Sequence, residues 1–292
     1  MRLGFGLGLQ YSKLSDGGSG FEGMLDLFPN GSFAASIRKL KANYADDSTT
    51  VRRDNSDQLG IGFANNELNE PELVTFADGG DAFNVDFKDQ TGNGRNFSQG
   101  SAASQPKIVS NGTVIKANTK PTLSYDGTND HLRCPATDFV TATNKLQVSV
   151  VCKNNSTNVD NQLIIAQYDS VNSQRSWAFR FFNGVMEIIF GNTDDGTFAA
   201  GYRASTFISP ENLNSLGFTF DSGVVVLYAN GSVIDGREVP GTVPTLLFDS
   251  NADVTIGSAL WEGDISEAYL ADNLTDSIVE IQQNQMEYFN IN

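Results

Sequence analysis

The chain has 292 residues, and its 19 Lys and Arg face 35 Asp and Glu, which gives a formal charge of −16 at pH 7. One histidine, His131, excludes a zinc site built from several histidines and leaves a Ser-His-Asp triad only that residue to depend on. The negative charge repels phosphate backbones, so we expect no nucleic acid partner, and no apolar run approaches the ~20 residues of a membrane span.

Residues 1–28 are rich in glycine. Glycine costs backbone entropy and adds no side chain to a core, so we expect an N-terminal arm and not an independent unit. Apolar residues alternate from Leu3 to Tyr11, which suits a strand added to another subunit; a frayed terminus is the alternative. The segment lacks the continuous apolar stretch and the small-residue cleavage site of a signal peptide.

After the arm, the apolar spacing predicts a helix over 32–44. A short strand at 51–53, a helix at 69–76 capped by Asn69, and a strand at 83–87 follow. Alternating apolar residues are too few here to close a second core. We therefore expect this segment to pack on the rest of the chain as part of one domain.

Downstream, short alternating runs separated by turn residues predict a β-sandwich or barrel. Asn183-Gly184 and Asn230-Gly231 are two-residue hairpin turns by their sequence. A capped helix at 275–289 ends the chain. Cys134 and Cys152 fit small apolar strand positions, and a disulfide between them is the alternative. The expected strands are 122–125, 131–134, 146–152, 162–168, 177–182, 185–190, 198–203, 214–220, 224–229, 232–235, 253–257 and 264–270.

Several motifs resemble known families. The motifs Ala35–Leu40, Val51–Asp54, Ile61–Phe63 and Phe87–Asn96 resemble the catalytic domain of the α-L-arabinofuranosidase B family. The motifs Tyr125–Asp130, Leu227–Gly231 and Trp261–Glu267 are similar to the lectin-like domains of bacteriophage virion proteins. The resemblance implies an all-β, concanavalin A-like (laminin-G-like) jelly-roll sandwich with a few short peripheral helices and a C-terminal helix. It would comprise residues 29–292, with the arabinofuranosidase-like segment 29–120 packed on it.

The same resemblance bears on catalysis. Met186–Asn192 matches the context of the enzyme family's nucleophile and assigns that role to Glu187, whereas the family's acid falls on Ala259. A retaining glycosidase needs two carboxyl groups, so the resemblance implies that this chain is not an enzyme and that Glu187 is vestigial. Asp253, Glu262 and Asp264 are the carboxyl groups that could replace the acid.

Four residues are candidates for ligand binding. Asp89 and Asn93 lie in a glycine-rich loop that presents acceptors and donors, although such side chains also cap their own turns. Glu187 alternates with Met186 and Ile188, so it points out of the core if those two point in. Trp261 is a sugar-stacking candidate, as are Trp177 and Tyr202, with a core position as the alternative for the tryptophans.

Two acidic pairs are weak candidates for calcium. Asp126 with Asp130, and Asp194 with Asp195, resemble the loop carboxylates that bind Ca²⁺ in some lectin-like sandwiches. Calcium takes 6 to 8 oxygens, and each pair supplies few of them. We therefore expect no metal or other cofactor.

The resemblance implies a non-enzymatic structural component of a phage virion, located in the tail, a head fibre or a decoration-type appendage. The arm would bind other virion proteins, the chain would form a homo-oligomer, and the sandwich would contact host surface glycans. A carbohydrate-binding adhesin module and an active arabinofuranosidase are the two alternatives.

Overall fold

The computed structural model describes residues 20–139, 143–156, 161–209, 211–258 and 260–292. Antiparallel β-strands dominate it. The elements in chain order are α1 Met24–Leu27, β1 Phe33–Ser36, β2 Thr49–Arg53, β3 Gln58–Ile61, β4 Phe63–Ala64, β5 Glu67–Leu68, α2 Glu70–Ala77, β6 Ala82–Phe87, β7 Phe97–Ser98, η1 Ala102–Ser104, β8 Lys107–Ser110, β9 Thr113–Val114, β10 Lys116–Ala117, β11 Lys120–Pro121, β12 Leu123–Asp126, β13 Leu132–Cys134, η2 Ala136–Asp138, β14 Lys145–Asn154, β15 Gln162–Asp169, β16 Gln174–Phe182, β17 Val185–Gly191, β18 Phe198–Ala204, β19 Asn214–Asp221, β20 Val224–Ala229, β21 Ser232–Ile234, β22 Gly236–Val239, β23 Val254–Ile256, β24 Glu262–Ala271 and α3 Ile278–Phe289.

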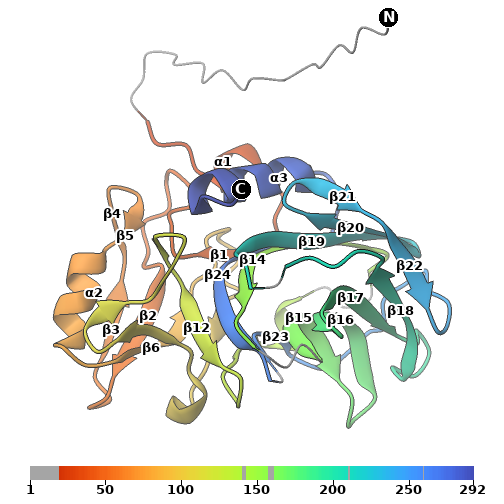
Figure 1. Cartoon of the computed structure of the whole chain (residues 1–292), viewed down its shortest axis with the longest axis horizontal. Coiled ribbons are helices and arrows are strands. Elements are labelled where there is room, and N and C mark those ends of the chain that lie inside the picture. Colours follow the sequence, from red (N-terminus) through yellow and green to blue (C-terminus); the bar gives the residue numbers. More distant parts are fainter. Residues whose placement is uncertain (1–19, 140–142, 157–160, 210, 259) are drawn as a thin grey trace, which may run out of the picture.

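Two layers of strands form a sandwich (Figure 1). One layer, called here the back sheet, runs β1-β24-β14-β19-β20-β21, and α3 covers its outer side. The other, the front sheet, runs β13-β23-β15-β16-β17-β18-β22. Strands β2, β3, β6 and β8 of the first third of the chain join both layers, through the pairing of β8 with β12, and of β7 with β13. The expected all-β sandwich with a C-terminal helix is confirmed.

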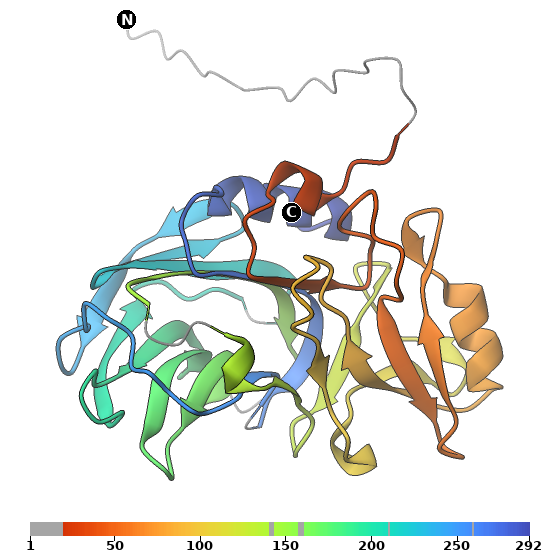
Figure 2. The same cartoon turned by 180° about the vertical axis from the view of Figure 1, so that it is seen from behind.

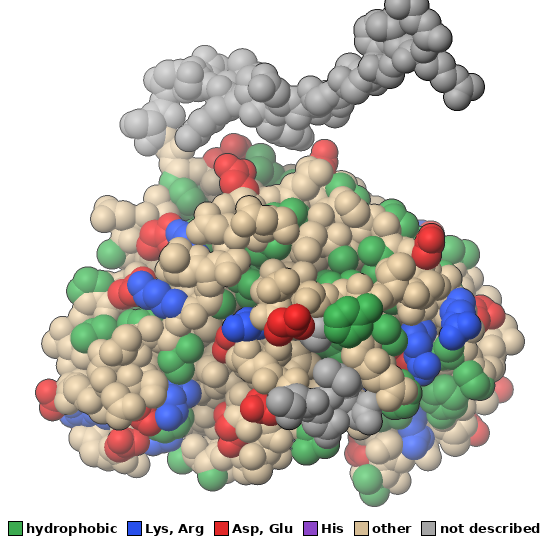
Figure 3. Space-filling model, viewed as in Figure 1, with side chains coloured by type: hydrophobic (Ala, Val, Ile, Leu, Met, Phe, Trp, Pro, Cys, Tyr) green, Lys and Arg blue, Asp and Glu red, His purple; other side chains and the backbone are tan. Residues whose placement is uncertain are grey.

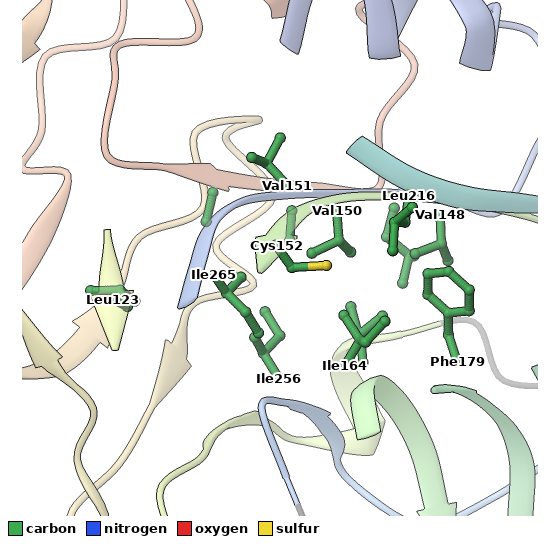
Figure 4. Packing of buried hydrophobic residues seen from close by; sticks show 14 of the residues in the cluster. Leu123, Val148, Val150, Val151, Cys152, Ile164, Phe179, Leu216, Ile256 and Ile265 are labelled. Carbon is green, nitrogen blue, oxygen red and sulfur yellow. The ribbon is translucent and has the colours of Figure 1, made fainter. Parts of the chain in front are cut away.

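The core lies between the two sheets. Figure 4 shows Val148 and Leu216 of the back sheet pointing towards Ile164 and Phe179 of the front sheet. All four side chains are fully buried, and together with residues from Phe33 to Ile291 they belong to one contiguous apolar cluster. Burial of apolar area at about 25 cal/mol per Å² is the main stabilising contribution in such a layered fold.

Local sequence signals are confirmed where the chain turns. In both Asn-Gly turns each residue has a positive φ, 50° and 74° at Asn183-Gly184 and 49° and 73° at Asn230-Gly231, as a type I′ turn requires. Helix α2 begins after Asn69 with a proline in its first turn. Ser277 caps α3, and its side chain accepts a hydrogen bond from Glu280 N.

The helix predicted over 32–44 is wrong. Residues 33–36 form β1, which pairs antiparallel with β24, and residues 37–44 continue as an irregular segment. All four β1 side chains are buried, since α1 and α3 cover one side and the core lies on the other. A strand buried on both faces has no alternating pattern to identify it, and tertiary pairing here overrides the helical spacing.

The described end of the predicted arm packs against the fold. In α1, Met24 and Leu25 are buried in a small cluster with Leu40, Tyr269 and Ile281. Figure 2 shows α1 on the same side of the sandwich as α3. Residues 1–19, with the alternation from Leu3 to Tyr11, lie outside the described residues, so the arm and its partners stay predictions.

Both cysteines are buried and free, as expected for small core residues. Burial raises the pKa of both thiols. Within the part of the chain that the structure describes, no helix combines the length and the apolarity needed to cross a bilayer.

A buried ion pair connects β1, β24 and α3. Glu267 on β24 is fully buried, and its carboxylate accepts hydrogen bonds from Arg38 Nε at 2.7 Å, Arg38 Nη2 at 3.0 Å and Ser36 Oγ at 2.7 Å. Arg38 also donates to Asn284 Oδ1 on α3 at 2.8 Å, and its guanidinium carbon lies 4.6 Å from the ring centroid of Tyr288. The pair thereby joins residues more than 200 positions apart.

Candidate functional site

A row of charged residues crosses the outer face of the front sheet. Phe181 and Met186 point into the core, so the side chains that alternate with them point away from it. The strand register places Arg180 of β16 opposite Glu187 of β17, and Glu187 opposite Arg203 of β18. Arg203 in turn lies opposite Arg237 of β22 in the strand register. We call these four residues the arginine row.

Glu187 is the centre of the row and is 1% exposed. Its Oε2 accepts from Arg180 Nε at 2.8 Å and lies 2.6 Å from Arg180 Nη2, while its Oε1 accepts from Arg203 Nε at 2.9 Å and Nη2 at 2.6 Å. Two forked guanidinium groups thus hold one carboxylate in a fixed orientation.

An aromatic ring supports both arginines. The guanidinium carbons of Arg180 and Arg203 lie 4.6 and 4.8 Å from the ring centroid of Phe182, within cation–π distance. Arg180 also donates from Nη1 to Asn161 Oδ1 at 2.6 Å. Phe182 is partly exposed, so an apolar surface borders the charged row.

Small and apolar residues lie next to the row on the same face. Ala166, Ala178 and Ile189 form a separate cluster with Leu163, outside the main core. Gly201 belongs to this face too: a Cβ there would lie 2.6 Å from Val239 Cγ2 and 3.4 Å from Glu187 Oε1. A side chain at position 201 would therefore clash with Val239 and lie in contact with the carboxylate.

Asp89 and Asn93 stabilise their own loop. The Asp89 carboxylate accepts from the backbone N–H groups of Ala34, Thr91 and Arg95 and from Thr91 Oγ1. Asn93 Nδ2 donates to Ser32 O at 3.1 Å. Asp89 nevertheless lines a polar cavity of about 680 Å³, together with Lys41, Tyr44, Asp46, Asp47, Lys88 and Thr91 among others, whereas Asn93 does not line it.

The tryptophans are core residues. Trp261 is 1% exposed and stacks on Phe181 with centroids 6.4 Å apart, and Trp177 packs edge-on against Phe218. Tyr202 packs against the core, and its hydroxyl donates to Gly236 O. In this structure none of the three offers an open face to a sugar, and Phe182 is the aromatic residue beside Glu187 instead.

The acidic pairs also serve local turns. Asp126 Oδ1 accepts from Thr128 N and Asn129 N, and Asp130 Oδ2 accepts from Asp126 N. Asp195 Oδ1 accepts from Thr197, while Asp194 N donates to Asn192. Among the described residues, no three His, Cys, Asp or Glu side chains are grouped as metal ligands would be. The absence of a metal from the structure does not test the calcium prediction.

The carboxyl group of Asp130 has a raised pKa. Burial, and then the nearby Asp126 carboxylate, raise the pKa of Asp130 to about 6. It borders a cavity of about 620 Å³ next to the buried Tyr125. Lys107, which bonds to Asp81, opposes this rise only in part.

The predicted acid position, Ala259, lies outside the described residues. Of the carboxyl groups that could replace it, Asp264 is buried, and burial raises its pKa. However, Asp264 and Glu262 belong to β24 of the back sheet, whereas Glu187 is on the outer face of the front sheet. Asp253 accepts a hydrogen bond from Ala136 N and forms an ion pair with Arg133.

The sequence placed Glu187 on the outer face but did not identify its arginines. Arg180 and Arg203 both alternate with core residues on predicted strands, so their orientation could be derived from sequence. Their pairing with Glu187 depends on the register of two hairpins, and Arg237 lies on β22, a strand that was not predicted.

No protein-family model matches this sequence, and no curated protein matches it. Solved structures do. An arabinofuranosidase complexed with arabinofuranosyl-α-1,2-xylobiose aligns with a TM-score of 0.63 and 10% identity. Two GH54 α-L-arabinofuranosidases, one soaked with a cyclic sulfate inhibitor and the other a variant soaked with 4-nitrophenyl α-L-arabinofuranoside, align with TM-scores of 0.62 and identities of 12% and 13%. Each alignment covers 87% of this chain and 62% of the other, so the chain spans less than two thirds of those proteins.

These comparisons show a shared sandwich fold and correct two expectations. A non-enzymatic phage virion component is contradicted, because the three structures that align over 87% of the chain are arabinofuranosidases and nothing in them indicates a bacteriophage. The inference that the chain is not an enzyme is contradicted by the same matches. The inference from Ala259 relied on one position of a short motif, Ile256–Ala259, in a chain that is only 10–13% identical to these enzymes.

Proposed function

We propose that this chain is a glycoside hydrolase that acts on an arabinofuranoside-containing saccharide at the outer face of its front sheet. The observation that carries the proposal is Glu187, a single oriented carboxylate on that face of a fold shared with arabinofuranosidases. The shared fold supports the sugar class, and the arginine row supports the position of the site.

Glu187 has the charge that cleavage of a glycosidic bond requires. The transition state resembles an oxocarbenium ion, and an ionised carboxylate beside the anomeric carbon stabilises it or attacks it. Arg180 and Arg203 orient the Glu187 carboxylate, and their four contacts occupy most of its lone-pair directions. One guanidinium contact must therefore open when the substrate binds.

The choice of leaving group determines whether the assay requires an acid catalyst. An alkoxide needs protonation, to which a positioned acid contributes roughly 10² to 10⁴ in rate, whereas nitrophenolate leaves with little help. Release of nitrophenolate from 4-nitrophenyl α-L-arabinofuranoside therefore depends mainly on the carboxylate and needs little help from an acid. We expect turnover by the full chain, and at least a 100-fold loss in Glu187→Gln.

A matched control removes a carboxylate elsewhere. Glu72 lies exposed on α2 and bonds to Asn69, so Glu72→Gln should keep full turnover. Equal turnover by the wild-type chain and Glu187→Gln, or no turnover by the wild-type chain, would contradict the proposal.

A further inference from the structure

We infer that the arginine row is a subsite for an acidic saccharide, in which Arg203 and Arg237 bind the carboxylate of a uronate residue. The inference rests on the proposed function for the kind of ligand, and it adds the charge of that ligand. It assigns a role to Arg237, which nothing in the fold explains.

Charge is the first argument. The row holds three arginines against one carboxylate, so it carries an excess of two positive charges on a chain whose formal charge is −16. No hydrogen bond or ion pair joins the Arg237 side chain to any of the described residues, and that side chain is exposed. In contrast, ion pairs hold Arg38 and Arg53.

The scattered charges elsewhere make this concentration unusual. On the face seen in Figure 3, acidic and basic side chains lie dispersed among polar and apolar ones. A local positive field attracts an anionic ligand even when the net charge of the protein is negative.

Geometry is the second argument. Arg203 and Arg237 are cross-strand neighbours, so their Cβ atoms are about 5 Å apart. Arg203 gives Nε and Nη2 to Glu187, which leaves its Nη1 for a ligand. Two adjacent planar guanidinium groups match the two oxygens of a carboxylate.

Shape is the third argument. From Arg180 to Arg237 the row crosses three strand spacings of about 4.8 Å, which is about 14 Å and comparable to a short oligosaccharide. Phe182 borders the row and offers an apolar ring edge to a sugar. The overall acidity disfavours a polyphosphate or nucleic acid as the anion, because those ligands extend beyond the row.

The probes are trigalacturonic acid and its fully methyl-esterified form, which have the same backbone and differ in charge. Titration calorimetry in 20 mM NaCl should give at least tenfold tighter binding of the acid, and most of that difference should disappear in 300 mM NaCl. Arg237→Gln should weaken binding of the acid about tenfold and leave binding of the ester unchanged, because only the acid has a carboxylate for the lost guanidinium.

Two further variants complete the experiment. Arg53→Gln removes the same charge from β2 and should bind the acid as the wild-type chain does. Glu187→Gln removes the row's only negative charge and should bind the acid more tightly while it loses turnover. This opposite response separates the two proposals, since turnover tests the hydrolase and affinity tests the subsite.

Equal binding of the acid and the ester, unchanged affinity in Arg237→Gln, or no binding of the acid by the wild-type chain would each overturn the subsite. None of these results depends on hydrolysis of the nitrophenyl substrate. Arg237 is exposed on β22, so its substitution leaves the core intact and the variant can be compared directly.

Discussion

Two buried glutamates, Glu267 and Glu187, meet arginine forks in different surroundings. Glu267 is paired with one arginine and lies under α3, where Ser36 and Asn284 complete the hydrogen bonds of the pair. Glu187 is shared by two arginines whose side chains are 15% and 24% exposed. The first pair is closed and neutral, and the second is open on one side and positively charged. We therefore expect folding stability to depend more on Glu267 than on Glu187, whose proposed role is in turnover.

The largest expected effect is at Glu267. In Glu267→Gln the charge of Arg38 stays buried without a counter-charge, which costs about 3–5 kcal/mol of unfolding free energy. In Glu187→Gln, Arg180 and Arg203 can turn to water, so we expect a loss of about 1–2 kcal/mol. Urea unfolding of the two variants at pH 7 measures both values. Equal losses would show that the two ion pairs contribute equally to stability, which contradicts the expected difference between them.

Substituting lysine for the arginines tests the same difference between the two ion pairs. Lysine keeps the charge but cannot supply the two parallel N–H groups of a fork. We expect Arg38→Lys to cost about 2 kcal/mol, because Glu267 and Asn284 both depend on the fork. Arg203→Lys should cost less than about 1 kcal/mol, since its side chain is partly exposed. Thermal unfolding monitored by circular dichroism would reveal the difference, and a larger shift for Arg203→Lys would reverse the assignment.

The smallest expected effect concerns a carboxyl group without an arginine. The pKa of Asp130 is raised from its ordinary value of 3.8 to about 6, so the unfolded chain loses this proton at lower pH than the folded chain does. Its contribution to stability is therefore greatest below about pH 3.8 and is lost as the pH rises to about 6. Asp130→Asn should stabilise the fold at pH 7 by about 0.5 kcal/mol, a small value because the group is partly exposed.

The control for that prediction is the pH dependence itself. The stability difference between Asp130→Asn and the wild-type chain should be near zero at acidic pH and reach its plateau above pH 6. A constant difference across this range would mean that the amide acts through packing and not through titration.

The sequence predicted much of the fold through short-range signals. Both Asn-Gly turns, α2, α3 and most strands after residue 121 follow from φ requirements, caps and alternation. The error at β1 has a physical cause, since its pairing with β24 lies more than 200 residues away and no local pattern encodes it. The same limit applies to the site: alternation placed Glu187, but only the strand register brought Arg180, Arg203 and Arg237 beside it.

The position of β24 in the chain has a consequence for synthesis. This strand pairs with β1, β12 and β14, and it begins at residue 262 of 292. Contacts between residues so distant close large loops, which makes folding slow. While the chain emerges from the ribosome, β1 and β14 lack their shared partner, and the strand edges that pair with β24 stay open until β24 has been made. Chaperone protection of the nascent chain should therefore matter most in the interval before β24 emerges.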